Sequence, residues 1–112
     1  MAKGFNPHGI WGPRQRGFNI GVVQHEGQVI HFTGQVAWDE AEQIIGKGDV
    51  EAQTKQCFKN ILAVLKSVGG TIEDLVAITT YFTDRSQLPA IQKVRGEFLK
   101  HETAPVSTSV MV

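Results

Sequence analysis

Hydrophobic residues recur along the chain with a helical period in two stretches. The first stretch begins after Asp49, a good N-cap, and ends at Gly69. The second begins near Ser86 and accepts Pro89 in its first turn. The apolar stripes consist of Phe58, Ile61, Leu62, Leu65 and Val68 in the first helix and of Leu88, Ile91, Val94, Phe98 and Leu99 in the second. Each predicted helix therefore covers an apolar surface with one of its faces.

Stretches rich in β-branched residues predict four strands. Residues 18–24 and 29–36 are joined by His25-Glu26-Gly27-Gln28, which suits a hairpin turn, so we expect them to pair antiparallel. Residues 75–82 and 106–112 predict the other two strands. The sequence from Thr71 to Asp74 resembles a capping box and predicts a short turn before the third strand.

The element order is strand, strand, helix, strand, helix, strand. This order predicts an α+β fold in which a mixed sheet carries two helices on one face. Residues 1–16, which contain several glycines and prolines, are expected to form an irregular arm before a single domain over residues 17–112. Apolar residues fall on both faces of residues 75–82, with Ile78 on one face and Tyr81 on the other. Since the two helices cover one face, another copy of the chain is the simplest cover for the second.

Composition and charge narrow the expected partners. The 112 residues include 11 basic and 11 acidic side chains, so no overall positive field attracts nucleic acid. The chain has no apolar leader and no apolar run of about 18 residues, which predicts a cytoplasmic location without a membrane partner. The histidines lack the close spacing of metal ligands, so no metal is expected; they are His8, His25, His31 and His101.

Short motifs at matching spacings resemble the reactive-intermediate deaminase family, also called the RidA or YjgF-like family. The first is Thr33-Gly34-Gln35, which follows the apolar run of the second predicted strand. The others are Gly48-Asp49, Gln53-Thr54, Asn60-Ile61, Gly69, Tyr81 with Thr83-Asp84, and Pro105 with Val110 and Val112. The resemblance covers nearly all residues after Gly17. It implies a chorismate-mutase-like α+β fold, a homotrimer whose sheets form a central barrel, and ligand pockets in the clefts between subunits.

The resemblance also predicts a departure from the family's chemistry. Deaminating members hydrolyse reactive enamines and imines to a keto acid and ammonia without a cofactor. Their Pro-Ala-Arg-Ser-Cys-Val segment places an arginine in the cleft, where it clamps the substrate carboxylate. Residues 105–110 of this chain read Pro-Val-Ser-Thr-Ser-Val, so Ser107 occupies the arginine's position. A serine hydroxyl forms hydrogen bonds but supplies neither the charge nor the planar fork.

Five residues are candidates for lining a cleft that binds a small molecule. They are Thr33, Gly34, Gln92, Ser107 and Ser109. Each also has a plainer interpretation, because a glycine in a strand often marks a bulge, a glutamine on a helix is often solvated, and serines on a strand often form a subunit contact.

The leading hypothesis is a homotrimer that binds a small carbonyl or carboxylate metabolite without arginine-dependent deamination. The alternative is an enamine or imine deaminase of altered substrate range, or a related hydrolase that uses a water held by Ser107, Ser109 and Thr33. A ribonuclease is the third class, and the neutral net charge argues against it.

Overall fold

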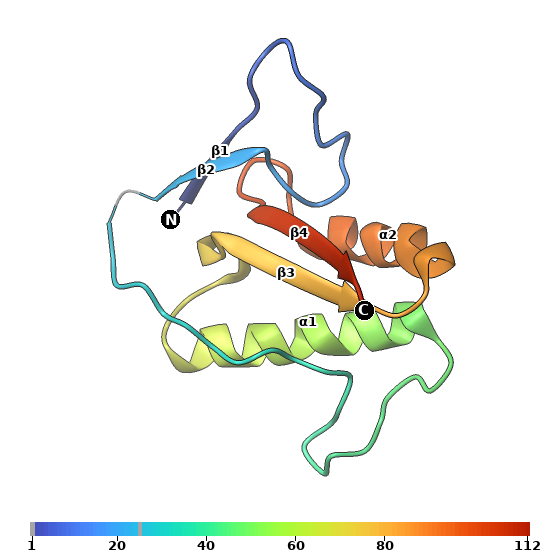
Figure 1. Cartoon of the computed structure of the whole chain (residues 1–112). Coiled ribbons are helices and arrows are strands. Elements are labelled where there is room, and N and C mark those ends of the chain that lie inside the picture. The colour runs from blue at the N-terminus through green and yellow to red at the C-terminus, as the bar shows by residue number, and fades with distance from the viewer. Residues whose placement is uncertain (1, 25) are drawn as a thin grey trace.

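The computed structural model describes residues 2–24 and 26–112 of the chain. The elements in those residues are β1 (Ala2–Phe5), β2 (Gly21–Gln24), α1 (Val50–Ser67), the short 3₁₀ helix η1 (Ile72–Asp74), β3 (Ala77–Phe82), the 3₁₀ helix η2 (Arg85–Gln87), α2 (Leu88–Phe98) and β4 (Val106–Met111) (Figure 1). Strand β1 pairs antiparallel with β2, and β3 pairs parallel with β4. The predicted α+β class is therefore confirmed, with two small sheets in these residues where one mixed sheet was expected.

Local capping explains where the helices begin. The Asp49 carboxylate accepts a hydrogen bond from the Ala52 amide at 3.1 Å and so satisfies one free donor at the start of α1. The second helix begins differently from the prediction near Ser86. There the Asp84 carboxylate accepts from the Ser86 amide at 2.9 Å and closes η2, so α2 proper begins at Leu88.

The predicted hairpin between residues 18–24 and 29–36 is wrong. Residues 21–24 form β2, but its partner is β1, which comes from the arm expected to be irregular. Residues 29–36 join neither sheet. Two glycines allow β1 to pack this closely, since a Cβ at Gly21 would collide with the Phe5 ring and one at Gly4 would collide with Asn19. His25, in the expected turn, lies outside the described residues.

Residues 29–36 instead run along α1, as Figure 1 shows. The Asn60 side-chain amide of α1 donates to the carbonyls of Val36 at 3.1 Å and Trp38 at 3.0 Å. The Cys57 thiol lies 3.6 Å from the carbonyl of Gln35. Because helix side chains bind these carbonyls, the segment is held against α1 without a strand partner.

The hydrophobic core lies where the helices meet β3 and the loops around it. Phe58 of α1 stacks on Phe98 of α2 with ring centroids 4.9 Å apart. Val94 is fully enclosed, and Ile78 of β3 packs against the same cluster. The buried members are Phe58, Leu65, Leu75, Val94, Leu99 and Ala104. The helical stripes predicted from periodicity therefore supply most of the core.

The two faces of the β3–β4 pair have different surroundings. Parallel pairing puts Ser107 beside Ile78, so Ser107 lies on the side of β4 that faces the core. Ser109 is two residues further along the same side of the strand, but it is exposed. On the opposite side Tyr81 pairs with Val110. These two side chains are 68% and 37% exposed, so this face is open in the single chain.

Candidate functional site

Ser107 does not stand alone on β4, because an arginine from α2 reaches it. Arg95 Nη1 donates a hydrogen bond to Ser107 Oγ at 3.1 Å. Arg95 is only 2% exposed, although it is a charged residue on a short helix. A guanidinium thus lies beside the strand position at which the resemblance expects an arginine.

A second arginine and an aromatic ring complete this group, which we call the Arg95 cluster (Arg16, Phe18, Arg95 and Ser107). Arg95 Nε donates to the Arg16 carbonyl at 2.9 Å. The guanidinium carbons of Arg95 and Arg16 both lie 5.6 Å from the centroid of the Phe18 ring. Arginine over an aromatic face is a favourable cation–π arrangement. One ring therefore supports two cations.

A buried asparagine holds Phe18 next to the start of β4. Asn19 is 2% exposed, and its Nδ2 donates to the carbonyls of His101 at 2.7 Å and Ala104 at 2.8 Å. Its backbone amide donates to the Pro105 carbonyl at 2.9 Å. These bonds tie residues 18–19 to the turn before β4, so the position of the ring is fixed by buried polar contacts.

Close glycine packing brings the loop before Phe18 onto α2. Gly17 has a φ of 81°, which favours glycine, and a Cβ there would lie 2.8 Å from the Arg95 carbonyl carbon. On the facing side, a Cβ at Gly96 would lie 3.0 Å from the Gln15 carbonyl oxygen. Glycine at these two positions therefore allows the loop and the helix to touch.

Among the described residues, no acid group pairs with the charges of the Arg95 cluster. Burial and the neighbouring Arg16 lower the pKa of the Arg95 guanidinium, which still remains protonated at neutral pH. Within residues 2–24 and 26–112, no carboxylate forms an ion pair with Arg95 or Arg16. Burial of a charge without a partner is costly. This part of the fold is thus suited to an anion.

The other four predicted site residues are not part of the Arg95 cluster. Gln92 is half-buried and precedes Arg95 by one turn of α2, and Ser109 is exposed on β4. Thr33 and Gly34 are exposed in the segment along α1, where no hydrogen bond between described residues joins them to Ser107. A ligand-lining role for these residues stays a prediction.

Arg95 was missed by reasoning from the sequence. It follows Ile91 by four residues and precedes Leu99 by four, so it sits within the apolar stripe of the second helix. A charged residue on a stripe that faces the core is the signal that could have identified it. Its proximity to Ser107 and Phe18 could not have been read from the sequence.

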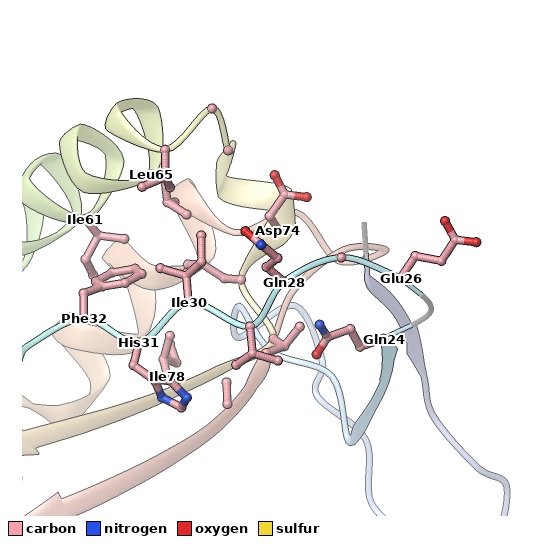
Figure 2. A pocket seen from close by; sticks show the side chains of 18 residues that line it. Gln24, Glu26, Gln28, Ile30, His31, Phe32, Ile61, Leu65, Asp74 and Ile78 are labelled. Carbon is pink, nitrogen blue, oxygen red and sulfur yellow. The ribbon is translucent and has the colours of Figure 1, made fainter.

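A separate hollow of about 450 Å³ lies between Gln24 with residues 26–32, the end of α1, η1 and β3 (Figure 2). Its walls are mostly apolar and include Ile30, Phe32, Ile61, Leu65 and Ile78. The polar side chains that line it are Gln24, Glu26, Gln28, His31 and Asp74. None of the five predicted site residues, and no arginine or lysine, is among the described residues that line it. The hollow suits an apolar group better than an anion.

Among residues 2–24 and 26–112, no group of three or more His, Cys, Asp or Glu side chains is arranged to hold a metal ion. No helix in those residues is long and apolar enough to cross a membrane.

Comparison with known proteins places the chain in one family. Residues 15–112 match the family described as Endoribonuclease L-PSP. The chain is 33% identical over 86 residues to a RutC family protein of Pyrococcus abyssi, an alignment that covers 77% of this chain and 67% of the relative. It is 35% identical over 80 residues to a RutC family protein of Synechocystis sp., covering 70% of this chain and 62% of the relative. The chain thus spans about two thirds of the length of these relatives.

Solved structures agree with the family match. The structure of the Rid family protein YyfB from Yersinia pestis, a protein of unknown function, superposes with a TM-score of 0.91 at 30% identity, covering 99% of this chain and 85% of that one. RidA from an Antarctic Psychrobacter superposes with a TM-score of 0.65 at 28% identity, covering 71% and 63%. Sequence and fold together show that the chain belongs to the Rid family, described as Endoribonuclease L-PSP.

Proposed function

We propose that this protein is a homotrimer that binds a small carbonyl or carboxylate metabolite in clefts between its copies, without the arginine-dependent deamination of its imine-hydrolysing relatives. The observation that carries the proposal is that Ser107, which the resemblance aligns with the family's arginine, lies on β4 and accepts a hydrogen bond from Arg95. No carboxylate or imidazole of the described residues hydrogen-bonds to either side chain. Binding needs polar contacts only, whereas hydrolysis also needs a group that moves a proton.

The open face of the β3–β4 pair supports the trimeric part of the proposal. Tyr81 and Val110 lie side by side there, and they are 68% and 37% exposed. Trp38 and Ile44, joined by a β-bridge in the loop before α1, are also 46% and 57% exposed. Exposed apolar groups of this size typically become buried by association, and cyclic assembly covers the same surface on every copy.

An imine hydrolase of altered substrate range is the second candidate. The guanidinium of Arg95 favours it, because positive charge is retained beside Ser107 although β4 itself carries none. In such a reaction, water adds to the imine carbon, the carbon–nitrogen bond breaks, and nitrogen leaves as ammonia. A ribonuclease activity, which the family description names, would need a basic surface that a chain of zero net charge is poorly suited to provide.

The proposal is tested by assembly, binding and turnover measured on the same preparation. Light scattering after size exclusion should give three chains per particle at micromolar concentration. Thermal unfolding with a panel of small oxo acids should show ligand-dependent stabilisation. Hydrolysis of 2-iminobutyrate generated in situ should stay at the blank rate, with an arginine-bearing family member as the positive control.

Two outcomes would contradict the proposal. A monomer that no oxo acid or neutral analogue stabilises would remove both the clefts and the ligand. Hydrolysis at the rate of the positive control, reduced in Ser107→Ala, would establish the hydrolase candidate instead.

A further inference from the structure

Arg95 carries a positive charge into a place from which water is nearly excluded. The residue is 2% exposed, and the acceptors that it meets are the neutral Arg16 carbonyl and Ser107 hydroxyl. A guanidinium has five N–H donors, and these contacts use two of them. Its charge is therefore solvated poorly and neutralised by nothing that the described residues contain.

The remaining nitrogen is the one through which a ligand could reach the charge. Arg95 Nη2 forms no hydrogen bond with the described residues. Among those residues, no side-chain nitrogen or oxygen is both fully buried and without a partner. Nη2 therefore keeps some contact with solvent.

Arg16 makes the uncompensated charge larger. Its guanidinium is held by the carbonyls of Pro13 at 2.8 Å and Gly12 at 2.8 Å, and it lies over the same Phe18 ring as that of Arg95. The two like charges repel, since they lie over one ring and neither forms an ion pair with a carboxylate of the described residues. An anion near both would relieve the repulsion and replace the missing counter-charge.

We propose that Arg95, assisted by Arg16, is an anion-recognition site that takes the carboxylate of a small organic acid, so that α2 supplies the guanidinium that β4 lacks. This inference rests on the proposed binding function and narrows its ligand to an acid. A guanidinium is matched to a carboxylate because two of its donors can meet the two oxygens. Gln92, one turn earlier on α2, offers an amide to the neutral part of such a ligand.

The test compares an acid with its uncharged counterpart. Calorimetric titration at constant ionic strength would use 2-oxobutyrate, 2-oxobutanamide and inorganic phosphate as probes. In the wild-type protein the acid should bind about tenfold or more tightly than the amide, since charge-assisted hydrogen bonds are roughly twice as strong as neutral ones. Arg95→Met should abolish that preference, so that acid and amide bind with similar affinity.

Three further variants sharpen the result. Arg95→Lys keeps the charge but loses the fork, so it should retain part of the preference. Arg16→Gln should reduce it less than Arg95→Met. Lys93 lies on the same helix, is 65% exposed and is paired with Glu51. Lys93→Met removes this exposed cation and should leave the preference for the acid unchanged. If Arg95→Met does not fold, the acid-to-amide comparison in the wild type and in Arg95→Lys still decides.

Several results would overturn the inference. Equal binding of acid and amide by the wild type would do so while leaving the proposed binding function standing. Binding of phosphate in preference to the oxo acid would remove the carboxylate assignment. A change in the number of chains per particle in Arg95→Met, with acid binding preserved, would show that a neighbouring copy neutralises Arg95. If none of the probes binds, the proposed function itself fails.

Discussion

Two regions of this protein could receive a small molecule, and they differ in what they offer it. The hollow beside β3 has a volume of about 450 Å³ and mostly apolar walls. The Arg95 cluster brings together two cations, an aromatic ring and a hydroxyl from the loop before β2, α2 and β4. The volume of the hollow indicates only that a small group fits there. The unused donors and the unpaired charge of the cluster indicate the chemical class of the group that binds. The comparison favours the cluster as the recognition site for an acid.

The two regions also differ in how they are held together. The cluster is fixed by buried hydrogen bonds from Asn19 and by glycine contacts with α2. One wall of the hollow is formed by residues 26–32, which join neither sheet. Polar contacts that water cannot replace make a site rigid, and a wall without strand pairing opens more easily. Stability measurements on matched variants, in the cluster and in the segment that continues from this wall along α1, test this difference.

The largest expected effect contrasts two asparagines that make the same contacts in different surroundings. Asn19 and Asn60 each donate to two backbone carbonyls through Nδ2. Asn19→Ala leaves buried carbonyls without a partner, at about 1–3 kcal/mol each, so the free energy of unfolding should fall on the order of 3 kcal/mol. In Asn60→Ala, water can bind the carbonyls of Val36 and Trp38 instead. The free energy of unfolding should therefore fall by less than about 1 kcal/mol. Urea unfolding measures both, and similar losses would refute the difference in rigidity.

The next effect contrasts two glycines. Gly17→Ala forces a Cβ against Arg95 at a φ of 81° and should destabilise the protein by roughly 1–3 kcal/mol. Gly34→Ala points into open space, so it should change the free energy of unfolding by less than about 0.5 kcal/mol. Thermal unfolding of the two variants provides the measurement. A large loss for Gly34→Ala would mean that residues 29–36 are packed more tightly than their exposure indicates.

The smallest expected effect concerns the Cys57 thiol, which lies beneath residues 29–36. Burial raises the pKa of this thiol, so less of it is thiolate at a given pH than in the unfolded chain. A disulfide reagent should therefore modify the native protein more slowly than the urea-unfolded one between about pH 7 and 9. Because the folded pKa is raised, this group stabilises the fold at low pH, and its contribution is lost as the pH rises through that value.

Cys57→Ser is the control for the labelling experiment, since it should show no reaction. Equal labelling rates for the native and unfolded protein would indicate that residues 29–36 do not shield the thiol. That result would mean that the whole segment, and not only the part that lines the hollow, opens readily to solvent.

Most of the regular structure could be predicted because its causes are local. The apolar stripes and the Asp49 cap predict both helices, and alternation predicts β3 and β4 to within one or two residues. The hairpin failed because the sequence pattern of residues 29–36 did not reveal that Asn60 would bind the carbonyls of that segment. Of the site, Ser107 was identified from a motif, whereas Arg95 was assigned to no role at all.

The sequence by itself determined the helices and the serine on the last strand. Only the tertiary structure decided that β1 pairs with β2 and that Arg95 meets both Ser107 and the carbonyl of Arg16, 79 positions away. Helical periods and caps act within a few residues, so they are visible along the chain. A charge cluster forms from segments distant in sequence, and close glycine packing and buried hydrogen bonds, which appear only in three dimensions, bring them together.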